Sequence, residues 1–225
     1  MVAITLPDGK VQKFSNPISG TDIALKIGPG LAKAALAIRI NGEMKDLTTC
    51  ISEDSNVSIV TCSDADALEL LRHDASHVLA MAVQELFPET QITFGPATED
   101  GFYYDFHRDK AFSIDDFDTI EKRMVEIIDR NIPIIREIWK KDEVAEFFGN
   151  KGETFKAEWV KELPDNEEIS MYRQGNWIDL CRGPHLPSTG KLPKAFKLLK
   201  LAGAYWRGNS SNPMLQRMYG TCWAN

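Results

Sequence analysis

Three of the four histidines in the chain fall into two short motifs that could share one site. His73 and His77 are four residues apart in a stretch typical of a helix, so their rings should lie on one face, one turn apart. The segment CRGPH adds the thiol of Cys181 and the imidazole of His185. Although the two motifs are far apart in the sequence, we expect these four side chains to meet in a single cleft.

Three imidazoles and one thiolate suit several chemistries. They match the tetrahedral ligand set that zinc accepts in proteins. Without a metal, one histidine could act as a general base on a water molecule while the other side chains orient a substrate. A third alternative is nucleophilic attack by Cys181 after activation by a histidine. A purely structural role is disfavoured, because so many of the histidines lie in two tight motifs.

The other polar candidates are weaker. We interpret His107, which is surrounded by charged residues, as a surface residue. Cys50, Cys62 and Cys222 are interpreted as small apolar side chains. Residues 28–30 read GPG but lack the Lys-Ser/Thr that completes a phosphate-binding loop, so ATP binding is unsupported.

Residues 67–87 are expected to form the long helix that positions the histidine pair. Their apolar residues recur at the helical period and form a stripe opposite the histidines. The histidine side is itself half apolar, so we expect a helix covered on two sides, with the histidines lining a cavity. The second motif follows a hairpin over 169–181, whose second strand should carry Asp179 and Cys181 to the edge of a sheet.

The rest of residues 63–225 alternates strands and helices. Residues 92–107 predict two strands, in which alternation places Tyr103 and Tyr104 on opposite faces, so that one of them faces inward. Residues 113–131 begin with a capping-box pattern and form one helix. The pattern assigns no structure to residues 152–162.

Residues 1–62 predict a compact β-grasp (ubiquitin-like) unit. A hairpin, two short helices, a second hairpin and a last strand follow in order, and Thr21 is the expected N-cap of the first helix. Residues 63–225 should form a larger α+β domain with a long central helix packed on an antiparallel sheet. The fold class is therefore α+β, with domains 1–62 and 63–225.

The composition is that of a globular protein. Of 225 residues, 43% are hydrophobic and 26% are charged, which is enough for a real core. A net charge of −7 argues against a generic polyanion binder, so any RNA contact should be local. The chain shows neither a signal-peptide pattern nor a run of 18 apolar residues, so we expect a cytoplasmic protein with no membrane partner.

Side by side, the motifs resemble the N-terminal half of bacterial threonyl-tRNA synthetases over nearly the whole chain. The segment DIALKIGPGLAKAA is similar to the TGS domain of that family. Similar to its editing domain are RHDASHVLAMAVQELFP, FGPATEDGFYYDF, WIDLCRGPH and AGAYWRGNSSNPMLQRMYGTCWA. Ser76 and Cys222 stand where that family often has alanine, and we expect little consequence.

The resemblance implies hydrolysis of seryl-tRNA(Thr), which forms when serine is mistaken for threonine. One methyl group discriminates by only about 1–3 kcal/mol, so a second pocket is needed to remove the error. The residues to which the resemblance assigns this work are His73, His77, Cys181, His185 and Lys156, with Asp179 and Tyr104 as contacts to the seryl group and the terminal adenosine.

The resemblance also bears on metal and mechanism. Related alanyl-tRNA editing domains hold zinc with the same two motifs, whereas the threonyl ones look metal-independent. We therefore expect attack by water, with His73 handling the water or the ribose hydroxyl. Lys156 should help to place the carbonyl oxygen, and Cys181 should be a contact rather than a nucleophile.

In the family the chain continues beyond Asn225 into an ATP-binding catalytic domain with its own zinc, and then into an anticodon-binding domain. We therefore expect a fragment, possibly monomeric, that needs no cofactor and holds the serine-bearing acceptor end of tRNA(Thr) weakly. The full-length protein should be a homodimer through the catalytic domain. The main alternative is a non-catalytic RNA- or partner-binding module whose His/Cys cluster holds a structural zinc, and a thiol-dependent hydrolase is the third.

Overall fold

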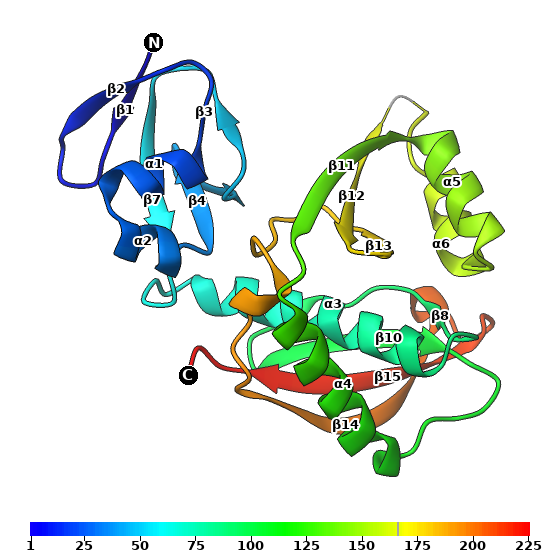
Figure 1. The fold of residues 1–225 in the computed structure, drawn as a ribbon. Coiled ribbons are helices and arrows are strands. Elements are labelled where there is room, and N and C mark those ends of the chain that lie inside the picture. The colour runs from blue at the N-terminus through cyan, green and yellow to red at the C-terminus, as the bar shows by residue number, and fades with distance from the viewer. Residues whose placement is uncertain (166) are drawn as a thin grey trace. The chain divides into compact units, whose positions relative to one another are not determined.

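The computed structural model describes residues 1–165 and 167–225, and it divides into two compact units. The first consists mainly of Met1–Leu70, and the second mainly of Leu71–Arg182 and Ser188–Asn225 (Figure 1). Both mix helices with sheets, which confirms the predicted α+β class. The predicted boundary between residues 62 and 63 stays a prediction.

The first unit is a β-grasp fold, as predicted. Its sheet has the strand order β2-β1-β7-β4-β5, with β1 parallel to β7 and the other neighbours antiparallel. Ile4, Ile23 and Ile38 are fully buried in its core. Its elements are β1 (Val2–Thr5), β2 (Val11–Phe14), β3 (Ile18–Ser19), α1 (Gly20–Ile27), α2 (Pro29–Ala34), β4 (Ala37–Ile40), β5 (Glu43–Asp46), β6 (Cys50–Ile51) and β7 (Ser55–Val60).

Helix α1 begins earlier than predicted. Its N-cap is Ser19, whose Oγ accepts a hydrogen bond of 3.1 Å from the backbone N–H of Asp22. The predicted N-cap, Thr21, lies inside the helix, so that prediction was wrong. Gly20 makes the earlier start feasible, because a side chain at this position would collide with Leu47 and Ile38. The tight approach of the helix to these two residues was not visible in the sequence.

The second unit contains a four-stranded antiparallel sheet with the order β14-β15-β10-β8, to which β9 adds by pairing with β10. Helix α3 runs along this sheet and α4 crosses it obliquely (Figure 1), which confirms the predicted central helix. The elements are α3 (Ala67–Leu86), β8 (Gln91–Ile92), β9 (Ala97–Thr98), β10 (Gly101–His107), η1 (Ile114–Asp116), α4 (Phe117–Arg130), η2 (Thr189–Lys191), β14 (Phe196–Tyr205), η3 (Trp206–Gly208) and β15 (Met214–Cys222).

A three-stranded antiparallel sheet completes this unit, with the order β11-β12-β13. Val144, Phe148 and Met171 are fully buried in the core that this sheet shares with two helices. The predicted hairpin is confirmed, because Gln174 pairs with Trp177 across the turn. The elements are β11 (Ile134–Lys140), α5 (Lys141–Asn150), α6 (Thr154–Lys161), β12 (Glu168–Gln174) and β13 (Trp177–Leu180).

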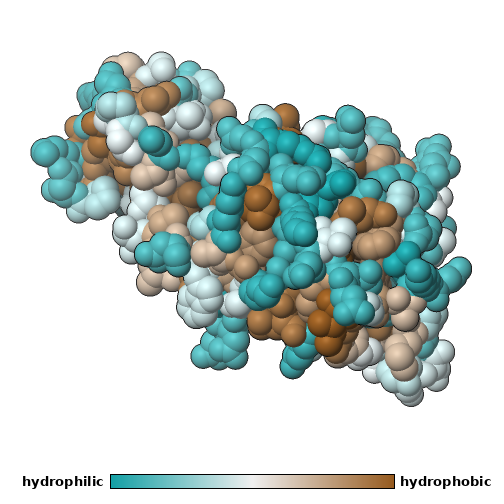
Figure 2. All heavy atoms as spheres, turned by 60° about the horizontal axis from the view of Figure 1, so that its bottom comes forward, coloured by the Kyte–Doolittle hydropathy of each residue, from teal (hydrophilic) through white to brown (hydrophobic). Residues whose placement is uncertain are grey.

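The surface is largely polar. On the face drawn in Figure 2, hydrophilic side chains predominate and hydrophobic areas are scattered between them, as on most globular proteins. Across the described residues, none of the helices combines the length and the apolar character needed to cross a membrane.

Candidate active site

Helix α3 holds the two histidines side by side. Their ring centroids are 4.8 Å apart, as expected for residues one turn apart on one helix face. His77 is 3% exposed, whereas His73 is only half-buried. Leu71 and Leu79 on the opposite side are fully buried. The helix is thus covered on both sides, and His73 is the more accessible of the pair.

Strand β13 brings Cys181 to the histidines. The backbone N–H of Cys181 donates a hydrogen bond of 3.2 Å to Ser170 O, so the residue continues the pairing of β12 and β13 beyond the last strand residue. Its Sγ lies 3.1 Å from Nε2 of His73. The structure thus brings the two sequence motifs together, and the ligand atoms of His73, His77, Cys181 and His185 all lie within 4.8 Å of one another.

Three further residues form a buried polar group beside the histidines. Tyr104 donates from its hydroxyl to Oδ2 of Asp179 at 2.7 Å. The ammonium of Lys156 donates to Oδ1 of Asp179 and lies 3.2 Å from the Tyr104 hydroxyl. Each of the three residues is 1% exposed. Tyr104 is thus the inward-facing tyrosine of the predicted strand, and Lys156 belongs to α6.

The electrostatics of this group depend on the ion pair between Lys156 and Asp179. A buried charge without a partner would be costly, but each of these two charges has the other within contact. Burial, together with the negative charge of Asp179, raises the pKa of Tyr104 well above its usual value. Tyr104 therefore stays protonated at neutral pH and acts as a hydrogen-bond donor.

Asp179 also links this group to the histidine pair. Its Oδ2 lies 3.6 Å from Nδ1 of His77, a distance at which a carboxylate favours a proton on that nitrogen. The rings of Tyr104 and Trp177 stand nearly perpendicular to His77, with centroids at 6.3 and 5.9 Å. His77 is therefore fixed in orientation by its neighbours, and His73 is better placed to meet a substrate.

A supporting network was not predicted from the sequence. Trp177 donates from its indole to Oε1 of Gln84 at 2.8 Å, and the amide of Gln84 donates to Glu153. Glu153 also accepts a hydrogen bond of 2.8 Å from the backbone of Ile92, and burial raises its pKa. Glu153 belongs to a stretch to which the pattern assigned no structure, so its burial had no signal in the sequence.

The four candidate ligands can be tested against the geometry of zinc. Bond lengths of about 2.0 Å to nitrogen and 2.3 Å to sulfur separate the ligand atoms of a tetrahedral site by about 3.5 Å. Here Nε2 of His73 and Sγ of Cys181 are 3.1 Å apart, and all four ligand atoms lie within 4.8 Å of one another. The residue types fit zinc, but the side chains would have to shift to surround it. As placed, His73 and Cys181 contact each other directly.

Comparison with known proteins identifies two domains. Residues 2–61 match the TGS domain model, and residues 169–219 match the model of the threonyl and alanyl tRNA synthetase second additional domain. Among the similar curated proteins are threonine–tRNA ligases of Rhodospirillum rubrum (63% identical over 223 residues), Paramagnetospirillum magneticum (64% over 224) and Thiobacillus denitrificans (59% over 225). At least 99% of this chain is covered, but only 35% of each relative.

Proposed function

Because the chain belongs, through its TGS and second additional domains, to the family of the threonine–tRNA ligases, we propose that it hydrolyses mischarged seryl-tRNA(Thr). The observation that supports this most is the contact between His73 and Cys181, which joins the two sequence motifs. His73 is only partly buried, so its imidazole can meet a substrate and act as a general base on water. His77, Asp179, Tyr104 and His185 complete the proposed site.

In the proposed reaction a water molecule attacks the acyl carbon of the seryl ester. His73 takes a proton from the water as the new C–O bond forms. The bond from the acyl carbon to the ribose oxygen then breaks, and that oxygen takes the proton from His73. Serine and a tRNA with both terminal ribose hydroxyls are released. Cys181 serves as a contact and forms no bond to the substrate.

Lys156 has a defined part in this reaction. An ammonium group has three N–H donors, and the contacts with Asp179 and Tyr104 use two of them. The third can reach the carbonyl oxygen, where negative charge develops as water attacks. Asp179 holds Lys156 in place through the ion pair, and it also favours one tautomer of His77. Asp179 and His77 thus position the other groups, Lys156 stabilises the carbonyl oxygen, and His73 carries the proton.

Selectivity is the second half of the proposal. A synthetic site that accepts threonine also accepts the smaller serine, and the missing methyl is worth only about 1–3 kcal/mol. A second pocket can exclude threonine by a clash with that methyl. We therefore propose the acceptor end of tRNA(Thr) carrying serine as the substrate of this chain.

The direct test compares two substrates. The 225-residue chain is incubated with Ser-tRNA(Thr) and with Thr-tRNA(Thr), and the ester that remains is measured over time. We expect loss of serine and retention of threonine, and a loss of serine slower by about 10²- to 10⁴-fold with His73→Ala. Equal rates for both substrates would contradict the selectivity, and no hydrolysis of either would contradict the function.

One observation favours a second candidate function. Three imidazoles and a thiol within 4.8 Å could hold a structural zinc in a non-catalytic RNA- or partner-binding module. Elemental analysis after mild chelation separates the two. Stoichiometric zinc whose removal unfolds the chain would support the binding module, whereas full deacylation by a metal-depleted chain would support the hydrolase.

A further inference from the structure

A pocket separate from the proposed active site lies along α3, on the C-terminal side of the histidines. It has a volume of about 390 Å³, which is within the range of sites for small ligands. Met81, Ile132 and Trp177 are among the residues that line it, so its walls are partly apolar and partly aromatic. Gly175 and Asn176, in the turn between β12 and β13, are exposed at its edge. We call it the Gln174 pocket.

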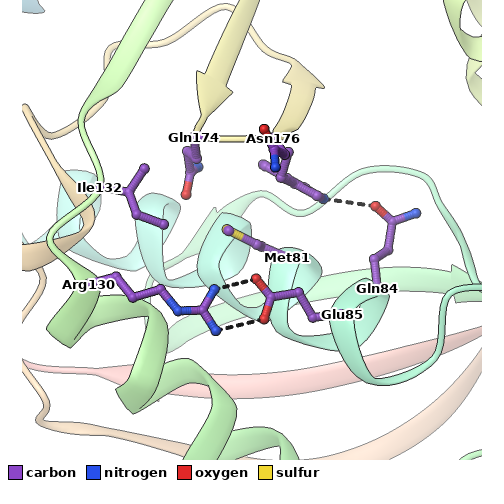
Figure 3. Close-up of a pocket in the computed structure, with 9 residues that line it drawn as sticks. Met81, Gln84, Glu85, Arg130, Ile132, Gln174 and Asn176 are labelled. Carbon is purple, nitrogen blue, oxygen red and sulfur yellow. Dashed lines mark hydrogen bonds and ion pairs between the residues drawn. The ribbon is translucent and has the colours of Figure 1, made fainter.

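Gln174 is the unusual residue of this pocket. It is 0% exposed, yet within the described residues neither its amide nitrogen nor its amide oxygen has a hydrogen-bond partner. Figure 3 shows its side chain extending from the end of β12 into the space between Ile132 and Met81. Buried amides are normally hydrogen-bonded on both atoms, because leaving them unpaired costs free energy. A ligand that presents a donor beside an acceptor would satisfy both atoms.

The charges around the pocket indicate a neutral ligand. Arg130 faces it, but both of its terminal nitrogens bond to the carboxylate of Glu85, at 2.6 and 3.0 Å (Figure 3). This bidentate pair neutralises the guanidinium and leaves little charge to attract a phosphate. The planar face of Arg130 can still stack on a flat ring. The pocket therefore suits a flat, uncharged group with an amide-like edge.

An unpaired nucleobase has these properties. Proteins bind single-stranded RNA ends by stacking bases on aromatic rings or guanidinium planes and by bonding to their edges. A glutamine amide can pair with an adjacent donor and acceptor on a base. The proposed substrate ends in unpaired nucleotides, so it would supply such a base beside the ester.

The position of the pocket indicates which base. At 1.5 Å per residue, Met81 lies about 6 Å and Glu85 about 12 Å beyond His77 along the helix axis. The base of the terminal nucleotide is bonded to the esterified ribose, which must lie at the histidines. A pocket one to two helical turns further away suits the next base along the strand.

Resting on the proposed function, we propose that the Gln174 pocket binds the base of the penultimate nucleotide of the tRNA acceptor end. Gln174 pairs with the edge of that base, and Trp177 or Arg130 stacks on its face. Trp177 also contacts His77, so the same indole lies against the pocket and against the proposed active site. Occupation of the pocket would thus help to hold the ester beside His73.

The test measures binding of uncharged RNA to the 225-residue chain. The probe is an acceptor-stem hairpin with the natural single-stranded 3′ end, compared with hairpins that carry an abasic nucleotide at the penultimate or at the terminal position. For the unmodified chain, the penultimate abasic change should weaken binding roughly 5- to 150-fold, the value of one bidentate base contact. Gln174→Met should weaken binding of the natural hairpin by a similar factor. The variant should bind the penultimate abasic hairpin as well as it binds the natural hairpin, because the contact between Gln174 and that base is already lost.

Control measurements keep the result clear. Thr90→Val is the matched variant. Thr90 is also buried, its side-chain oxygen has no hydrogen-bond partner in the described part of the chain, and it does not line the pocket. The variant should bind all three hairpins as the unmodified chain does. Gln174→Met should keep its thermal midpoint, since it removes two unpaired buried atoms. The comparison of hairpins on the unmodified chain needs no variant at all.

Three results would overturn the inference. One is equal binding of the natural and the penultimate abasic hairpins by the unmodified chain. Another is that Gln174→Met weakens binding of the natural hairpin and of the penultimate abasic hairpin by the same factor. A third is that Gln174→Met weakens binding of the natural hairpin but has no effect on binding of the terminal abasic hairpin, which would mean that Gln174 contacts the terminal base. Because the readout is binding of uncharged RNA, a failure of the proposed deacylation would leave these measurements unaffected.

Discussion

At the scale of single residues, the contact between His73 and Cys181 decides between two mechanisms. If water is the nucleophile, His73→Ala should slow deacylation of Ser-tRNA(Thr) by about 10²- to 10⁴-fold, the usual value of a positioned base. Cys181→Ser should keep most of the rate, because serine preserves the contact without the thiol. Single-turnover kinetics measure both rates. A seryl adduct on Cys181, detected by mass spectrometry, would contradict attack by water.

The buried ion pair gives a second residue-scale prediction. Lys156→Met should lower the free energy of unfolding by about 3–5 kcal/mol, because it leaves the Asp179 carboxylate buried without its counter-charge. Combining it with Asp179→Asn should recover much of the loss. Urea unfolding at pH 7 measures each variant. If Lys156→Met alone is as stable as the unmodified chain, the ion pair is not buried in solution.

Single residues also show what the sequence could predict. The spacing of His73 and His77 was sufficient to place both rings on one helix face, since that depends on local geometry alone. The partners of Trp177 and Glu153, and most of the residues that form the pocket around Gln174, come from other elements. A sequence pattern reports the period of one element and not what packs against it, so these roles had no local signal.

At the scale of elements, an ion pair ties α3 to α4. Burial opposes ionisation of Glu85, but hydrogen bonds from Arg130 and Arg123 outweigh it and lower its pKa. A lowered folded pKa means that the stabilisation is complete above the unfolded value of about 4.5 and is lost as the pH falls through the folded value. The link between the helices should therefore weaken in acid.

Glu85→Gln tests this link. At pH 7 the variant should be less stable by no more than about 1 kcal/mol, because a quarter of the Glu85 side chain is exposed. The difference from the unmodified chain should shrink below pH 4.5. Urea unfolding at pH 7 and at pH 3.5 gives both values. A difference that grows in acid would contradict the assigned direction of the shift.

The connection between α3 and β10 gives another element-scale prediction. Gly95 accepts a hydrogen bond of 2.6 Å from Ser76, and a methyl group at Gly95 would overlap the ring of Tyr104. Gly95→Ala should therefore cost about 1–3 kcal/mol of stability and reduce deacylation by displacing Tyr104. Thermal unfolding and the deacylation rate measure these effects.

Gly149→Ala is the matched control, because this helical glycine has open space around its Cβ position. It should raise stability by about 0.5–1 kcal/mol and leave the rate unchanged. Equal behaviour of the two variants would show that the approach of Gly95 to Tyr104 is not tight.

Elements differ in how far the sequence determined them. The hairpin of β12 and β13 was predicted because its alternation and its turn residues agree. Helix α6 was not assigned, since Phe155, Lys156, Ala157 and Val160 are all buried and do not give the polar outer face of a surface helix. Strand β14 is fixed by its pairing with β15, a long-range contact that no local pattern reports.

At the scale of the whole molecule, the first unit has a core of its own, which predicts that it can be weakened separately. Ile23→Ala should cost about 2–5 kcal/mol, because Ile23 is fully buried in that core. Hydrogen exchange followed by mass spectrometry should show faster exchange within residues 2–60, with little change in β10 and β15. Equal acceleration throughout would mean that the two units unfold as one.

The distribution of thiols makes this molecule convenient to label. Cys50 and Cys62 are exposed and both belong to the first unit, whereas Cys222 is buried. A maleimide dye or a nitroxide should therefore attach to that unit first. Because the thiol of Cys181 in the second unit is only half-buried, Cys62→Ser and Cys181→Ser together would leave Cys50 as the one accessible attachment point. With a second tag introduced on the other unit, spectroscopic rulers could then follow the spacing between the two when RNA is added.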